Sequence, residues 1–410
     1  MQVRINLFHT NLESDSKFVW NVSYICKMII RTAEAKALQL ASKFKALAII
    51  GPRQSGKTTL AKKLFKGKPY TSLENPDIRA FAEQDPRRFL AQYPDGAILD
   101  EVQRVPHLFS YLQEILDDSK KRGQFILTGS NNFTLQESIS QTLAGRMGFL
   151  NLLPLCFKEL ATTRYKTFDE NKYMLHGGYP AVYDEKHIPI DWYGSYLRTY
   201  VERDVRQLKN IGLLYSFERF MRLCAARTGQ ELNMSDLANE AGVDVKTIQS
   251  WISILENSYI IFLLRPHFKN FSKRLVKRPK LYFYDTGLAC FLLGIQNHKE
   301  LEINSHRGQL FETMVIGEMI KQRYNAGTPM NLYFWRDNAG HEVDVIIDRA
   351  GKLFPIELKS SHTASDKYLD GIRYWNELSN TNEGAVVYAG KLEHEPIKGF
   401  RFINWKNIDL

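Results

Sequence analysis

The segment Gly51-Pro-Arg-Gln-Ser-Gly-Lys-Thr58 constrains the fold of this chain more than any other feature of its sequence. It follows an apolar run at residues 46–50 and leads into a helical stretch at residues 59–65, so the GxxxxGK[ST] pattern stands in strand–loop–helix order. Glycines at these positions let backbone N–H groups and a helix N-terminus surround a phosphate. The segment therefore predicts a site for ATP and Mg²⁺.

The spacing also assigns a role to each residue of the loop. Lys57 is expected to reach the β- and γ-phosphates, and the Thr58 hydroxyl is expected to bind Mg²⁺. The residues expected to surround the nucleotide are Gly51, Pro52, Arg53, Gln54, Ser55, Gly56, Lys57, Thr58 and Thr59.

A second apolar run, residues 96–99, ends in Asp100 and Glu101. In P-loop ATPases such a strand is expected beside the phosphate-binding strand. Its aspartate would orient the Mg²⁺ shell, and the glutamate would polarise the attacking water. Alone, the pair is equally compatible with an ordinary turn that places acids at a helix N-terminus. The loop upstream favours the catalytic interpretation.

A third apolar run, residues 124–128, precedes Ser130 and Asn131, and one of these two is expected to sense the γ-phosphate. Helical patterns such as residues 107–119 separate the runs, which predicts an α/β domain with a parallel sheet. Arg146 is a candidate for neutralising transition-state charge, either in cis or from a neighbouring subunit of a homo-oligomer. An isolated arginine is more often a surface residue.

These segments together resemble one family, the prokaryotic AAA+-type ATPases that are paired with a C-terminal domain of unknown function. The resemblance extends from about Met28 to about Gly390 and implies ATP binding. Asn75 departs from it, because relatives tend to carry an acid there. The segments that carry the resemblance are GPRQSGKTTLAKKLF, YTSLENPDIRAFAEQDPRRFL, GAILDEVQRVPHLFSYLQEILDD, FILTGSNNF, LAGR, LHGGYP, YLRTYVERDV and KLYFYDTGLA.

The middle of the chain predicts a helix-turn-helix followed by a basic hairpin, the pattern of a winged helix. Two helical patterns, residues 232–241 and 245–257, meet at Gly242. Residues 265–280 hold seven Lys or Arg residues and no acid between two strand-like runs, which suits phosphate contacts. Such modules also serve as hinges, so a DNA contact is one of two interpretations. The side chains expected to face DNA are Lys246, Thr247, Gln249 and Ser250.

The last third contains two alternating runs around Ala350-Gly351 that predict a β-hairpin. With those two residues as its tip, Asp344 lies opposite Glu357, and Lys359 shares the face of Glu357. Two acids and a lysine on one face can bind a divalent metal and activate water. A solvent-facing hairpin with a cross-strand ion pair is the alternative.

This hairpin resembles the PD-(D/E)XK restriction-endonuclease-like fold, matched as Asp344 and then Glu357-x-Lys359, although Val343 stands where that family has proline. The resemblance implies a further acid on the preceding helix, for which Glu312 is the first candidate and Glu318 the second. A second divalent ion, Mg²⁺ or Mn²⁺, is then expected at Glu312, Asp344 and Glu357. Lys359 would stabilise the charge of the pentavalent phosphorane-like state or help to deprotonate the water.

Length and composition set the organisation around these motifs. The 410 residues carry a net charge of +10, which is compatible with a nucleic-acid partner, and 44% are hydrophobic, which excludes disorder. The four cysteines have no CxxC spacing, which suits a cytoplasmic location, and no apolar run could span a membrane. The expected order is a doubtful extension at 1–27, with Met28 an alternative start, a P-loop ATPase domain at 28–165, a helical connector at 166–212, a winged helix at 213–295 and an α/β restriction-endonuclease-like domain at 296–410.

The leading hypothesis is an ATPase coupled to a metal-dependent nuclease-like domain, with DNA as the favoured substrate. In this hypothesis Lys57, Glu101 and Arg146 are catalytic at the first site. Asp344, Glu357 and Lys359 are catalytic at the second. The rival is a nucleotide-dependent switch or assembly protein whose winged helix and inactive nuclease fold are docking surfaces. A small-molecule kinase is disfavoured, because the sequence shows no motif for a second substrate.

Overall fold

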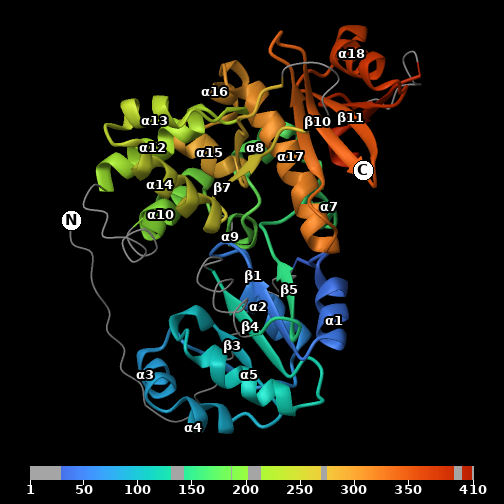
Figure 1. The fold of residues 1–410 in the computed structure, drawn as a ribbon. Helices are drawn as coiled ribbons and strands as arrows, with labels where there is room; N and C mark the ends of the chain where they lie inside the picture. The colour runs from blue at the N-terminus through green and yellow to red at the C-terminus, as the bar shows by residue number, and fades with distance from the viewer. Residues whose placement is uncertain are drawn as a thin grey trace, which may run out of the picture.

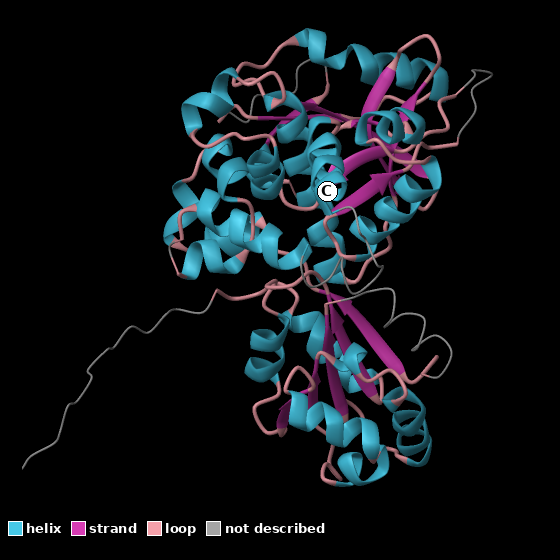
Figure 2. Ribbon diagram, turned by 90° about the vertical axis from the view of Figure 1, so that its left-hand side faces the viewer, coloured by secondary structure: helices cyan, strands magenta, loops and turns pink. Residues whose placement is uncertain are grey.

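The computed structural model describes residues 29–130, 143–185, 187–201, 214–268, 275–391 and 399–408. The proposed extension at 1–27 and the candidate sensor Asn131 lie outside these residues. The first third of the chain forms a lower body, and the middle and last thirds pack together above it (Figure 1). In the perpendicular view of Figure 2, the sheet of the lower body runs up toward the upper body.

The lower body is a parallel five-stranded sheet in the order β2-β3-β4-β1-β5, which confirms the predicted α/β class. Apolar side chains of α1 and α2 cover one face, and those of α3, α4 and α5 cover the other. The elements are α1 (Glu34–Lys43), β1 (Ala46–Ile50), α2 (Lys57–Leu64), β2 (Tyr70–Ser72), α3 (Pro76–Gln84), α4 (Pro86–Ala91), β3 (Ile98–Asp100), η1 (Val102–Arg104), α5 (Leu108–Asp118), β4 (Phe125–Gly129) and β5 (Met147–Asn151).

Two details of this body differ from the sequence analysis or add to it. The strand that ends in Asp100 is not beside the phosphate-binding strand, because β4 lies between β3 and β1. Asn75, the departure from the family pattern, caps α3: its side-chain oxygen accepts hydrogen bonds from the backbone N–H groups of Asp77 and Ile78. An asparagine satisfies this N-cap role as well as an acid does.

The middle third is mainly helical and contains one small antiparallel sheet in the order β6-β8-β7. The two helical patterns around Gly242 are α13 and α14, and Gly242 itself ends α13 in the left-handed region at φ 71°. The elements are α7 (Phe157–Ala161), η2 (Arg164–Thr167), α8 (Glu170–His176), α9 (Pro180–Asp184), α10 (Pro189–Tyr200), α12 (Leu214–Ala226), β6 (Gln230–Glu231), α13 (Met234–Ala241), α14 (Val245–Asn257), β7 (Ile261–Leu264), β8 (Lys280–Phe283), α15 (Thr286–Leu292) and α16 (His298–Ile303).

The last third packs a long helix against a mixed sheet in the order β13-β12-β11-β10-β9. β9, β10 and β11 are antiparallel, whereas β11, β12 and β13 are parallel. One hydrophobic core runs through the middle and last thirds without a break. The elements are α17 (Arg307–Ala326), β9 (Leu332–Arg336), β10 (Glu342–Arg349), β11 (Lys352–Lys359), η4 (Asp366–Leu369), α18 (Asp370–Ser379), β12 (Ala385–Tyr388), β13 (Arg401–Asn404) and η5 (Trp405–Asn407).

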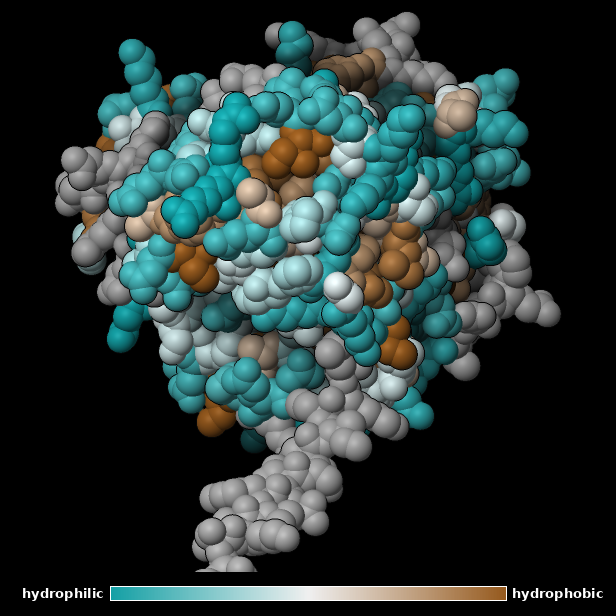
Figure 3. All heavy atoms as spheres, turned by 90° about the horizontal axis from the view of Figure 1, so that it is seen from below, coloured by the Kyte–Doolittle hydropathy of each residue, from teal (hydrophilic) through white to brown (hydrophobic). Residues whose placement is uncertain are grey.

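Seen from below in Figure 3, hydrophilic side chains cover most of the face, and hydrophobic side chains form separate patches. Within the described ranges, every helix is too short or too polar to cross a bilayer. Cys156, Cys224 and Cys290 are buried and form no disulfide among the described residues.

Candidate functional site

The loop between β1 and α2 has the backbone conformation that its glycines predict. Gly51 has φ 151° and lies so close to Leu152 that a Cβ there would stand 2.2 Å from the Leu152 carbonyl oxygen. Gln54 and Gly56 also have positive φ, at 60° and 92°. The loop therefore folds back on itself and presents its amides ahead of α2, as phosphate binding requires.

Lys57 is the first residue of α2, and its side chain is 5% exposed. Its Nζ donates a hydrogen bond of 2.7 Å to the Pro52 carbonyl oxygen, so the ammonium lies across the loop. Arg53, Ser55 and the exposed Gln54 complete the loop, and Thr59 continues the helix. The structure thus brings all nine predicted loop residues to one place.

Asp100 is held by hydroxyl groups from three elements. Thr58 Oγ1 donates to Asp100 Oδ1 at 2.9 Å, which joins the two residues predicted to hold Mg²⁺. Tyr70 donates to Asp100 Oδ2 at 2.8 Å, and Thr128 donates to Oδ1. Burial and the bond to Asp100 raise the pKa of Tyr70 to about 12. No sequence pattern indicated Tyr70 or Thr128, although Thr128 stands in the apolar run that forms β4.

Glu101 has the left-handed conformation, with φ 55°. Gln103 Nε2 donates to Glu101 Oε2 at 2.5 Å, and Ser130 Oγ donates to the same oxygen at 3.3 Å. The carboxylate is therefore held in place at the end of β3, next to the predicted sensor Ser130. Gln103 is a third residue that no sequence pattern indicated.

The predicted cis role of Arg146 is wrong. Its backbone carbonyl accepts hydrogen bonds from Lys45 and Ala46, which begin β1, whereas the nucleotide loop follows the other end of that strand. Its guanidinium forms an ion pair with Asp117 at the end of α5. Arg146 thus lies near the amino ends of the strands, whereas the loop lies at their carboxyl ends. A role toward a neighbouring subunit stays a prediction.

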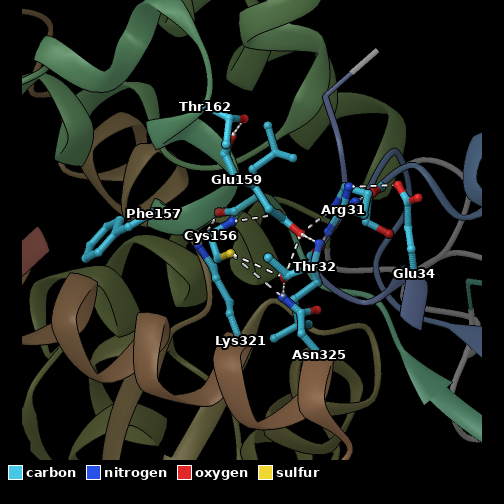
Figure 4. A network of polar contacts seen from close by, with 12 residues as sticks. Arg31, Thr32, Glu34, Cys156, Phe157, Glu159, Thr162, Lys321 and Asn325 are labelled. Carbon is cyan, nitrogen blue, oxygen red and sulfur yellow. Dashed lines mark hydrogen bonds and ion pairs between the residues drawn. The ribbon is translucent and has the colours of Figure 1, made fainter. Parts of the chain in front are cut away.

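A buried polar network joins the nucleotide loop to the upper body (Figure 4). Arg31 is 7% exposed and donates to the Ser55 carbonyl oxygen at 2.7 Å, to the Leu153 carbonyl oxygen at 2.6 Å and to Glu159 Oε1 at 3.1 Å. Glu159, on α7, also accepts from Thr32. Arg31 therefore fixes the loop to α7.

The same network reaches the last third of the chain. Asn325 on α17 donates to Thr32 Oγ1 at 2.7 Å, and Lys321 donates to the Leu155 carbonyl oxygen at 3.1 Å (Figure 4). Hydrogen bonds thereby connect residues before β1, after β5 and on α17 to the nucleotide loop.

Glu318 is not part of a metal site, which corrects its selection as a second candidate acid. It is fully buried and accepts hydrogen bonds from the Phe157 backbone N–H, at 3.0 and 3.1 Å, and from Gln322. Glu318 therefore caps the first turn of α7, whereas Glu312, nearly two turns earlier on α17, contacts β8.

Glu318→Gln should change how stability depends on pH. Burial raises the pKa of Glu318 from 4.5 to about 7, so protonation of this carboxyl stabilises the folded chain below pH 4.5, and this contribution is lost as the pH rises to 7. Relative to the variant, the parent should lose up to about 3 kcal/mol of unfolding free energy over that interval. Urea unfolding at pH 5 and pH 8 measures the difference. Glu83→Gln, at an exposed site, is the control. If the unfolding free energies of the parent and Glu318→Gln differ by the same amount at pH 5 and at pH 8, the expectation is contradicted.

The second cluster lies on the hairpin β10–β11, and its register is the one predicted. Arg349 pairs with Lys352 around Ala350 and Gly351, whose φ angles of 54° and 90° suit a two-residue turn. Asp344 Oδ2 accepts a hydrogen bond of 2.8 Å from the Leu358 N–H, next to Glu357. The β9–β10 register shifts between Val343 and Ile346, a stretch that includes Asp344.

Glu357, Lys359, Asp344 and Glu312 converge there. Lys359 Nζ donates to Glu357 Oε1 at 2.5 Å, while Glu357 Oε2 is buried without a hydrogen-bond partner among the described residues. Burial and the neighbouring Asp344 raise the pKa of Glu357, and burial, partly offset by Lys280, raises that of Glu312. Crowded carboxyl groups of this kind are frequent at functional sites.

Lys280 of β8 enters this cluster from the middle third, and no sequence motif predicted it. Its Nζ lies 3.3 Å from Glu312 Oε1 and also contacts Glu342, and the Tyr282 hydroxyl donates to Glu312. Burial alone would lower the pKa of Lys280, but Glu312, Glu342 and Asp344 outweigh burial and raise it. Lys280 therefore belongs to the acid cluster and not to the unopposed basic stretch assigned from the sequence.

The carboxyl groups fit a divalent ion only in part. Among the described residues, no three Asp, Glu, His or Cys side chains are arranged to hold a metal. Glu357 Oε2, which has no hydrogen-bond partner among the described residues, and the adjacent Asp344 suit a cation. Glu312, in contrast, already contacts Lys280 and Tyr282. Asp344 and Glu357 are thus the candidate metal ligands. Glu312, which the sequence predicted as a third ligand, is occupied by Lys280 and Tyr282 in this structure.

The predicted nucleic-acid surface on α14 is exposed at two of its four residues. On α14, Lys246 and Gln249 are exposed, while Thr247 and Ser250 are half-buried and Thr247 is also bonded to Asp244. In the basic stretch, residues 269–274 lie outside the described residues. α14 can therefore present at least two polar side chains to a partner.

Three family models match the chain in succession. Residues 43–161 match an AAA domain, and residues 167–299 and 307–408 each match a domain of unknown function. An uncharacterized protein of Mycobacterium tuberculosis is 29% identical over 345 residues, which cover 83% of this chain and 76% of that protein. One of Methanocaldococcus jannaschii is 24% identical over 354 residues, covering 78% and 75%.

Among solved structures, a Walker-type ATPase of Pyrococcus abyssi aligns with a TM-score of 0.44 and 13% identity over 65% of this chain and 96% of that one. The AAA match spans the loop, Asp100, Glu101 and Ser130, and the structure links Thr58 to Asp100 and Ser130 to Glu101 by hydrogen bonds. Residues 43–161 are thus P-loop ATPase-like and match an AAA domain, and the residues that follow match two domains of unknown function.

Proposed function

We propose that this protein hydrolyses ATP in its lower body and that nucleotide state controls metal-dependent cleavage of DNA by its last third. Asp344, Glu357 and Lys359, converging on one face of β10–β11, are the observation that carries the nuclease part of the proposal. The order α17-β9-β10-β11-α18-β12 with its mixed sheet supports a restriction-endonuclease-like fold.

At the nucleotide site, Lys57 would contact the β- and γ-phosphates, and Thr58 and Asp100 would hold Mg²⁺. Glu101, fixed by Gln103 and Ser130, would orient the attacking water. The bond of Arg31 to the loop offers a route by which movements of the loop could reach α7 and α17.

At the second site, Asp344 and Glu357 would hold a divalent ion, which supplies a water of lowered pKa and neutralises charge on the scissile phosphate. Lys359, beside Glu357, would stabilise the charge that develops on the phosphate oxygens. DNA is favoured as the substrate because the order α12-β6-α13-α14-β7-β8 supports a winged helix. Lys246 and Gln249 are exposed on α14, the second helix of the helix-turn-helix.

A supercoiled-plasmid assay with Mg²⁺ or Mn²⁺, with and without ATP, tests the proposal. The parent should nick the plasmid, and Asp344→Ala and Lys359→Ala should reduce nicking to background. Lys57→Ala should remove the effect of ATP on nicking, but it should leave the metal-dependent nicking itself intact. Lys352→Ala, at the exposed hairpin tip, should behave as the parent does. Nicking by Asp344→Ala and Lys359→Ala that is no weaker than that of the parent would refute the nuclease part of the proposal.

The second candidate is a nucleotide-dependent switch or assembly protein in which the last third is a docking surface. The contact of Lys280 with Glu312 favours it, because an ammonium group fills part of the acid cluster. In that case neither metal supports nicking by the parent, whereas ATP still changes which partners or copies of the chain it binds.

A further inference from the structure

We propose that Lys280, which belongs to the middle third, is the resident cation of the acid cluster in the last third, and that a divalent ion binds there only when Lys280 withdraws. This inference rests on the proposed metal-dependent function and concerns the regulation of that same site. It makes Lys280 a positioning residue whose backbone belongs to another part of the molecule.

The contacts of Lys280 are those of a built ion site. The residue is 4% exposed, and its Nζ reaches Glu312 on α17 and Glu342 on β10. The Phe334 ring centroid lies 5.5 Å from Nζ and closes one side. The two carboxylates and the aromatic ring stabilise the buried ammonium group, which would otherwise be costly to remove from water.

The backbone that carries Lys280 is fixed in the middle third. β8 pairs with β7 along its whole length and with β6, where Lys280 is opposite Glu231. Tyr282, two residues on and therefore on the same face of β8, donates its hydroxyl to Glu312. Two side chains from one strand thus hold the acid that the endonuclease resemblance assigns to the metal.

The ammonium and a divalent ion compete because they use the same carboxylate. While Glu312 is bonded to Lys280 and Tyr282, it cannot complete a ligand set with Asp344 and Glu357, in keeping with the absence of a three-ligand cluster among the described residues. A displacement of β8 relative to α17 that took Lys280 and Tyr282 away from Glu312 would free this carboxylate for a metal ion. The middle third would then set the metal affinity of the last third.

The test is a calorimetric titration of Mn²⁺ into the full chain without nucleotide. Lys280→Met, which keeps the length of the stem and removes the charge, should bind Mn²⁺ at least about tenfold more tightly than the parent. Lys280→Arg should restore affinity close to that of the parent. Lys352→Met makes the same charge change at an exposed position of the hairpin tip and should leave the affinity unchanged.

Lysine footprinting of the parent provides a measurement that needs no variant. Acetylation read by mass spectrometry should spare Lys280 without metal and modify it at saturating Mn²⁺, whereas Lys352 should react in both states. Protection of Lys280 that persists at saturation, or equal affinities of the parent and a folded Lys280→Met, would overturn the inference.

Asp344→Asn separates this failure from failure of the proposed function. If Asp344→Asn removes Mn²⁺ binding but Lys280→Met leaves the affinity unchanged, the metal site stands and the role of Lys280 is refuted. If neither the parent nor Lys280→Met shows Mn²⁺ binding that depends on Asp344, the metal-dependent function is refuted together with the inference.

Discussion

Lys57→Ala should lower the rate of ATP hydrolysis about 10²–10³-fold, the loss typical of removing one preorganised charge-stabilising group. Lys57 starts α2, and its buried ammonium already lies against the loop at Pro52. Alanine removes the only ammonium that this loop sequence supplies, whereas the backbone cradle at Gly51 and Gly56 remains. A coupled assay of phosphate release with purified protein measures the effect.

The control is Lys66→Ala, which removes an exposed lysine shortly after the same helix and should leave turnover unchanged. Circular dichroism of both variants should match that of the parent, because the hydrogen bond that Lys57 donates is to the loop at Pro52. If Lys57→Ala turns over ATP at the rate of the parent, the lower body is not the ATPase.

Arg31→Ala should reduce the free energy of unfolding by about 3–5 kcal/mol, the usual loss when one partner of a buried ion pair is removed. The side chain of Glu159 is fully buried, so its carboxylate would lose its cation where water cannot replace it. The carbonyl oxygens of Ser55 and Leu153 would each lose a charged donor as well. Chemical unfolding monitored by tryptophan fluorescence gives the value.

Arg87→Ala is the matched comparison, because Arg87 forms a two-bond ion pair with Glu114 at 3.0 Å on an exposed surface. Exposed pairs contribute little, so its unfolding midpoint should stay close to that of the parent. Equal losses in Arg31→Ala and Arg87→Ala would mean that the junction around Arg31 is open to solvent.

The nucleotide site was largely predictable from the sequence because its determinants are local. The loop from Gly51 to Thr58 and the acids after β3 owe their positions to short strands and tight turns. The hairpin register followed from the two-residue tip at Ala350 in the same way. The order of the strands did not follow, since pairing between β3, β4 and β1 depends on packing across the sheet.

Most of the contacts that the sequence did not indicate join residues far apart in the chain, although Gln103 and Glu101 are only two positions apart. Arg31 and Glu159 are separated by 128 positions, and Lys280 and Glu312 by 32 with an intervening change of module. Nothing in the spacing of single charged residues indicates such partners. Arg146 illustrates the converse. The local motif suggested a role at the nucleotide loop, but Arg146 lies beside the start of β1, whereas the loop follows the end of that strand.

The shared network at Arg31, Thr32 and Asn325 has a consequence for exchanging segments between relatives. Thr32 lies before the AAA match and Asn325 within the last one, and they are bonded across 293 positions. A chimera that takes its last third from a homologue would have to carry along residues 29–32 to keep this contact. The three segments are thus expected to be inherited as a unit, with compensating changes at their seams rather than free recombination between them.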